Sequence, residues 1–140
     1  RDMEAVMRLE NWERRLGDYL DTRRGQDFAY GTNDCGMFAA GAVEAVTGVD
    51  PIPSFRGAYD SATTSIRALK RLGKGTLDAT IDSLFDERPI GYGRRGDIVW
   101  NGESVGVCIG HEALFVGEIE GVSGLVSVPR SGWVKAWTVG

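Results

Sequence analysis

Cys35 is the residue of this 140-residue chain whose type and position best suit covalent chemistry. A polar turn of residues 31–34 runs directly into it. The apolar residues that follow keep the i+3, i+4, i+7, i+8 spacing of a core-facing helix, at Phe38, Ala39, Ala42, Val43 and Val46. Asn33 or Asp34 supplies the N-cap oxygen, and Gly48 can take the left-handed conformation that ends the helix. The pattern therefore places Cys35 in the first turn of a helix.

A thiol in this position is suited to nucleophilic chemistry. The unpaired amides and the dipole of a helix N-terminus favour negative charge, so the thiol of Cys35 is expected to ionise more readily than a thiol in a coil. At the ordinary pKa of about 8.5, only about 3% of a thiol is thiolate at pH 7. The alternative is that Cys35 is a small buried apolar residue that begins a helix, and the sequence leaves both interpretations open.

The rest of the composition limits the metals, cofactors and partners that the chain is expected to bind. The chain has two cysteines, Cys35 and Cys108, which we expect to be free thiols, and a single histidine, His111. With no histidine cluster and no CxxC motif, neither a metal site nor a cofactor is expected. The 16 Lys and Arg against 20 Asp and Glu leave a net charge of −4, which argues against a nucleic-acid partner.

The length of the chain is accounted for by one domain covering residues 1–140. No apolar run approaches the roughly 18 residues of a membrane-spanning helix, and the first residues lack the basic-then-apolar pattern of a secretion signal. We therefore expect neither a membrane-spanning helix nor export by the Sec pathway.

Three further stretches have helical periodicity. The first runs from Asp2 to about Arg24 and is stopped by Gly25, with Val6, Leu9, Trp12, Leu16, Tyr19 and Leu20 along one side. After a proline-containing loop, another runs from Ser61 to Leu72, with Ile66, Leu69 and Leu72 turned inward. The last begins near Thr76 and carries Leu77, Ile81, Leu84 and Phe85.

Past Pro89 the period changes from 3.6 to 2, and glycine turns separate short β-branched runs. The candidate strands are Asp97–Trp100, Ser104–Ile109, Ala113–Val116, Leu125–Val128 and Trp133–Val139. Short connections favour antiparallel pairing. Helices followed by a small antiparallel sheet predict an α+β fold.

A helix that presents a cysteine at its start, followed by a sheet opening with Gly-Asp and an aliphatic pair, resembles the papain-like fold of NlpC-type cell-wall peptidases. The matching stretches lie in the same order over roughly residues 25–117: Phe28-Ala29-Tyr30-Gly31, Asp34-Cys35, Gly96-Asp97-Ile98-Val99 and Val105-Gly106-Val107-Cys108-Ile109-Gly110. The resemblance implies an α+β, papain-like single domain with Cys35 as the catalytic nucleophile and His111 as the only histidine available as its base.

A closer likeness, over nearly the whole chain, is to a group of small phage-tail and prophage proteins. It is carried by the first helix with Trp12, by Asn33-Asp34-Cys35, and by Thr47-Gly48-Val49-Asp50-Pro51, Arg56-Gly57-Ala58-Tyr59 and Ala136-Trp137. This likeness implies a tail-tip component of the virion, made in the host bacterial cytoplasm, whose partners are other tail-tip proteins. Peptidoglycan peptides would be its substrates if it is active.

The sequence departs from the peptidase pattern at three places. Ser104 stands where the peptidases have the histidine that opens a strand, Gly36 where they have a serine, and Phe28 where they have a tyrosine. His111 lies seven residues past Ser104, roughly 20 Å along an extended strand, and is interpreted as a surface turn residue, with a catalytic base as the alternative. These departures favour a structural tail-tip protein that keeps the fold without a complete catalytic set. The alternative is an active thiol hydrolase cleaving peptidoglycan stem peptides during phage entry; a host binding or immunity protein on the same fold is a third class.

Four other residues receive simpler interpretations. Asp97 is expected to anchor a turn at the start of its strand, with a catalytic orienting role as the alternative. Cys108 alternates with apolar neighbours and is expected in the core. Trp133 and Trp137 are expected to share one face of the terminal strand, either in the core or at a subunit interface.

Overall fold

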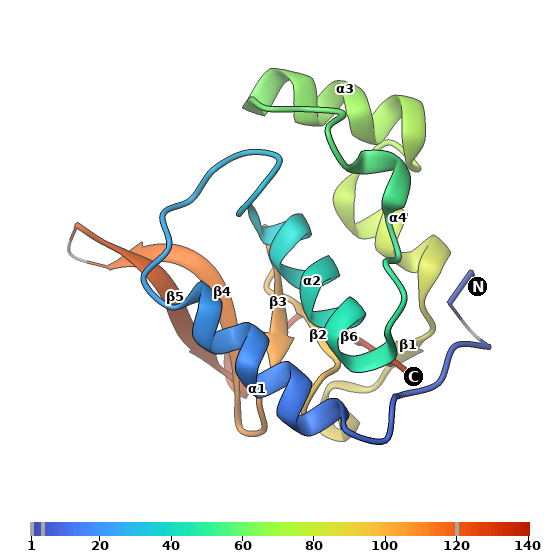
Figure 1. Cartoon of the computed structure of the whole chain (residues 1–140), viewed down its shortest axis with the longest axis vertical. Coiled ribbons are helices and arrows are strands. Elements are labelled where there is room, and N and C mark those ends of the chain that lie inside the picture. Colours follow the sequence, from blue (N-terminus) through green and yellow to red (C-terminus); the bar gives the residue numbers. More distant parts are fainter. Residues whose placement is uncertain (1, 4, 120) are drawn as a thin grey trace.

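The computed structural model describes residues 2–3, 5–119 and 121–140, which form an α+β fold (Figure 1). Its helices are α1 (Trp12–Arg23), α2 (Cys35–Thr47), α3 (Ala62–Leu72) and α4 (Leu77–Leu84), with 3₁₀ turns at Pro53–Phe55, Ile90–Tyr92 and Arg130–Gly132. The strands are β1 (Glu87–Arg88), β2 (Ile98–Trp100), β3 (Val105–Cys108), β4 (Glu112–Ile119), β5 (Val122–Pro129) and β6 (Lys135–Trp137).

Helix α2 lies at the centre of the fold and has the ends that the sequence predicts. The Asp34 carboxylate accepts a hydrogen bond from the Met37 backbone amide, so Asp34 is the N-cap. Gly48 ends the helix in the left-handed conformation, with φ of 78°. Most of the helix is buried, so its position fixes that of Cys35.

Helix α1 is shorter than the predicted Asp2–Arg24 span, because it begins only at Trp12. Tertiary contacts hold the preceding residues instead. The Leu9 amide donates to the carbonyl of Val46, and the Arg8 guanidinium donates to the carbonyls of Arg95 and Val139. These partners come from distant parts of the chain, so the local apolar spacing gave no sign of them.

Helices α3 and α4 start and stop near the predicted places, and each is capped by a hydroxyl. Ser61 and Thr64 form a capping box at α3, and Thr76 caps α4. The predicted inner face of α3 was right for Leu69, which packs beside the buried Ala68, but wrong for Ile66 and Leu72, which are exposed. Helix α3 thus packs at the edge of the molecule, as Figure 1 also shows.

The six strands form one antiparallel sheet in the order β1-β6-β2-β3-β4-β5. Five of them lie where the alternating pattern predicts, and β4 and β5 extend beyond the predicted ends as a long hairpin. Strand β1, of two residues, was missed because it is too short to show alternation. Strand β6 lies between β1 and β2 although it comes last in the sequence.

The main core lies between α1, α2, α4 and one face of the sheet, where Leu16, Phe38, Ile81, Val107 and Trp137 pack together. A smaller apolar cluster covers the opposite face and contains Val99, Cys108, Ala113, Phe115 and Trp133. Trp133 and Trp137 are therefore both buried, but on opposite faces of the sheet. The expectation that they share a face was wrong because Trp133 precedes β6 and lies outside the strand alternation.

Candidate functional site

Cys35 lines an apolar cavity of about 270 Å³ between α2, the α3–α4 pair and the sheet. Helix α2 contributes small side chains to its wall, including Gly36, Ala39 and Ala40. The opposite wall carries the larger residues Leu69, Leu77 and Ile81, and the sheet contributes Ile98 and Val105. The thiol therefore faces a cavity whose lining is almost entirely apolar.

Phe28 and Tyr30 stand where this cavity meets the surface, since both line it and they are 46% and 40% exposed. Their rings pack edge to face with centroids 4.8 Å apart. The loop that carries them is well fixed, because the buried Asn33 amide donates to the carbonyls of Gln26 and Asp27. The rings of Phe28 and Tyr30 therefore form a fixed aromatic rim at the mouth of the cavity.

The buried Asp34 carboxylate lies beside Cys35 and is fully engaged. One oxygen accepts from the Met37 amide at 2.9 Å. The other accepts from the Gly31 amide at 2.8 Å and from the Tyr59 hydroxyl at 2.6 Å. Burial, together with the hydrogen bond to Asp34, raises the pKa of Tyr59. Asp34 therefore fixes the helix start and the aromatic loop, and both of its oxygens already accept hydrogen bonds from other groups.

The Cys35 thiol has a pKa above its ordinary value, chiefly because burial disfavours the thiolate. A backbone hydrogen bond with Val105 works in the opposite direction, and the negative charge of Asp34 adds to the upward shift. The helix N-terminus alone predicts a lowered pKa, but here desolvation outweighs it. At neutral pH the thiol is protonated.

His111 lies in the turn between β3 and β4, is exposed, and is not among the residues that line the cavity. Cys35 meets the other end of β3, at Val105. The four residues of this strand separate its two ends by roughly 10 Å. The structure therefore does not bring together the two predicted catalytic residues, Cys35 and His111. Ser104, which directly precedes Val105, is at the end of β3 that lies nearer to Cys35.

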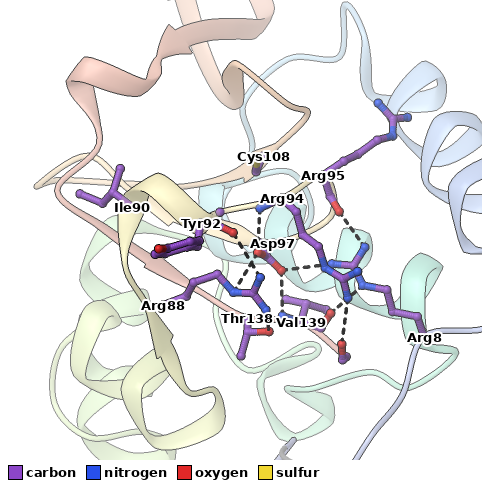
Figure 2. Close-up of polar contacts among 12 residues, drawn as sticks. Arg8, Arg88, Ile90, Tyr92, Arg94, Arg95, Asp97, Cys108, Thr138 and Val139 are labelled. Carbon is purple, nitrogen blue, oxygen red and sulfur yellow. Dashed lines mark hydrogen bonds and ion pairs between the residues drawn. The ribbon is translucent and has the colours of Figure 1, made fainter.

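Asp97 is a buried structural anchor at the start of β2 (Figure 2). One carboxylate oxygen accepts from Arg8 and from the Val139 amide, each at 3.1 Å. The other accepts from the Arg94 amide at 3.0 Å and pairs with Arg88 at 3.5 Å. The interpretation of Asp97 as a turn anchor is confirmed, and its contacts extend to three distant segments.

Neither cysteine of the chain forms a disulfide bond. Cys35 and Cys108 are free thiols, as expected, and Cys108 is buried on the far face of the sheet.

Among the residues that the structure describes, no group of three His, Cys, Asp or Glu side chains could hold a metal ion. No helix in that described part of the chain is long and apolar enough to cross a membrane.

Comparison with protein families gives a match that covers residues 7–139 and is described as "Domain of unknown function (DUF6950)". This chain belongs to the DUF6950 family. A comparison with curated proteins found no match. The DUF6950 match spans the cavity, the aromatic rim and the Asp97 anchor alike, so these features all lie within one family domain.

Two features of this DUF6950 domain escaped the sequence analysis. The Tyr59–Asp34 hydrogen bond cannot be predicted from the sequence, because 25 residues separate the two and no spacing rule joins them. The cavity was missed because the spacing of Leu69, Leu77 and Ile81 is that of ordinary core residues. The run of small residues on α2 at Gly36, Ala39 and Ala40 was the one available signal that a neighbour does not fill the space.

Proposed function

We propose that this DUF6950 domain is a phage tail-tip component of the virion with an NlpC-like, papain-like fold that no longer acts as a peptidase. The observation that carries the loss of activity is the environment of Cys35: a protonated thiol in an apolar cavity whose lining contains no histidine. The tail-tip role is proposed from the sequence likeness to small phage-tail and prophage proteins. The order of the sequence motifs supports the fold. A cysteine at the start of a helix that packs on an antiparallel sheet is compatible with it.

The chemistry of thiol peptidases explains why this environment argues against activity. Their histidine accepts the cysteine proton and later donates one to the leaving amine, which is typically worth about 10²–10⁴ in rate. This chain has one histidine, which lies at the wrong end of β3, and the neighbouring Asp34 carboxylate is occupied by three donors. His111 is thus too distant to exchange a proton with Cys35, and the three bonds of Asp34 hold it in a structural role.

On this proposal the domain works by binding other tail-tip proteins. Mass spectrometry of purified phage particles is expected to find it among the tail proteins, and co-expression with the products of neighbouring tail genes is expected to yield a stable complex. Particles that lack the protein would reject the tail-tip part of the proposal.

The alternative is an active thiol hydrolase that cleaves γ-D-glutamyl-diamino-acid bonds of peptidoglycan stem peptides. It is favoured by one observation, that Cys35 begins α2 and lines a cavity reaching the surface. Purified protein incubated with stem peptides is expected to release no more product than the Cys35→Ala variant. Turnover that disappears in Cys35→Ala and falls sharply in His111→Ala would establish the hydrolase instead.

A further inference from the structure

The geometry points to a small-molecule site: we propose that the cavity beside Cys35 binds an uncharged, apolar ligand of about one to two aromatic rings. An apolar cavity of about 150 Å³ in another protein stays dry and binds benzene. The cavity here measures about 270 Å³ and is also lined by apolar side chains. It therefore has room for more than one ring.

The hydroxyl and carboxylate groups of the inner wall already have hydrogen-bond partners within the protein. Asp34 and Tyr59 bond to each other. Ser65 donates to the Ala62 carbonyl, and Thr80 donates to the Thr76 carbonyl. Water needs two to four polar partners in such a site, so an apolar occupant is favoured over water. The same shortage disfavours a ligand that relies on several hydrogen bonds.

The walls explain why the protein's own side chains leave this space open. Helix α2 presents Gly36, Ala39 and Ala40, which reach only a short distance from its backbone. A Cβ built on Gly36 would make ordinary contacts with Asp34 Oδ1 at 3.5 Å and with Leu77 at 3.7 Å, so a longer side chain at this position would project into the space that the glycine leaves. The space is therefore a consequence of residue size along one helix face.

The negative charge of Asp34 distinguishes uncharged ligands from anionic ones. The Asp34 carboxylate is buried in the cavity wall, and an anionic group placed nearby would repel it in a medium of low dielectric constant. An anionic ligand is therefore excluded. A peptide segment from a partner protein is also disfavoured, because its amides would meet a rim made of the Phe28 and Tyr30 rings and a wall that is almost entirely apolar.

The proposed site is independent of the tail-tip function and of peptidase activity, so its test uses binding alone. 2-Naphthol, an uncharged two-ring probe, is titrated into the wild-type protein while iodoacetamide labelling of Cys35 is followed by peptide mapping. Occupancy is expected to slow labelling of Cys35 at least threefold and saturably, with a Kd below about 1 mM. The anionic counterpart 2-naphthoate is expected to leave the rate unchanged.

A matched pair of variants locates the effect. Ala40→Leu places three extra carbon atoms in the cavity and is expected to abolish 2-naphthol binding, read from ¹H–¹⁵N chemical shifts as well as labelling. Ala62→Leu adds the same atoms at an exposed position of α3 and is expected to bind as wild type does. Absence of saturable binding to the wild-type protein would overturn the proposal, whatever the folding of either variant. Equal binding of 2-naphthoate, or unchanged binding by a folded Ala40→Leu protein, would also overturn it.

Discussion

Burial, and not the helix dipole, sets the protonation of Cys35. The dipole and the free amides of a helix start stabilise a thiolate only where solvent or a cationic partner helps to hold the charge. Here apolar side chains surround the sulfur and the nearest charge is the negative Asp34, so the thiol pKa rises. The position of a cysteine in a sequence pattern therefore does not fix its reactivity.

The pH dependence of Cys35 labelling tests this balance. Because the folded-state pKa is raised, the rate of alkylation by iodoacetamide is expected to climb with an inflection above the value of about 8.5 of a free thiol. His111→Ala is expected to give the same profile, since His111 lies at the other end of β3. Peptide mapping separates Cys35 from Cys108. An inflection below pH 8 that moves in His111→Ala would contradict the assignment.

Tyr59 links the stability of the fold to alkaline pH. Its folded-state pKa lies above the unfolded value of about 10, so its stabilising contribution is complete below pH 10 and is lost as the pH rises above it. Tyr59→Phe is expected to lose about 1–3 kcal/mol at pH 7, because Asp34 loses a donor, but to decline less steeply between about pH 10 and pH 11. Urea unfolding at each pH measures both effects.

The control for Tyr59 is Tyr92→Phe, the same change on a ring that is 75% exposed. This variant keeps Tyr59 and is expected to retain the wild-type alkaline decline. If Tyr59→Phe and wild type lose stability with the same slope, the buried hydroxyl is not the group responsible.

At the scale of elements, sequence reasoning succeeded where local signals mark both ends of a segment. Helix α2 has a polar cap, a continuous apolar face and a terminal glycine, and its bounds were predicted correctly. Helix α1 was predicted too long because the contacts of Arg8 and Leu9 with distant residues override local helix preference. On α3 only Leu69 of the predicted inner face packs inward, because the helix lies at the edge of the molecule and leaves Ile66 and Leu72 exposed.

Asp97 shows how one side chain joins several elements. It holds Arg8, Arg88 and the Val139 amide at the start of β2, inside the protein. Asp97→Ala leaves these donors without their acceptor and is expected to cost about 3–5 kcal/mol of unfolding free energy, measured in urea. If this variant does not fold, Asp97→Asn keeps hydrogen-bonding capacity and is expected to be destabilised by less.

Asp21→Ala provides the matched control, because the Asp21–Arg24 pair is exposed, with side chains 75% and 57% accessible. Its expected change is within about 0.5 kcal/mol. Equal effects at Asp97 and Asp21 would show that the buried cluster adds nothing special to stability.

Across the whole molecule, stability is expected to be uneven. Helix α2 packs into the main core along its length, whereas α3 buries only Ala68 and borders the cavity. Hydrogen exchange by mass spectrometry is expected to show α3 amides exchanging at least about tenfold faster than α2 amides, through opening of α3 without global unfolding. Equal protection of the two helices would show instead that they open as one unit.

The fold class could be predicted from the sequence, because the change of apolar period from 3.6 to 2 is a local signal. The sheet order could not, since pairing β6 with both β1 and β2 depends on register between segments far apart in the chain. The site was predicted in part: Cys35 and its cap follow from spacing, whereas the cavity and Tyr59 depend on how three helices meet.

The interior position of β6 has a consequence for biosynthesis. Residues 135–137 fill the gap between β1 and β2, and Trp137 enters the main core. A ribosome delivers these residues after every other strand, so a nascent chain that lacks them exposes two unpaired strand edges and an unfilled core. The helices can form early, but the sheet must wait for its last strand, and the emerging chain is most open to chaperones during that interval.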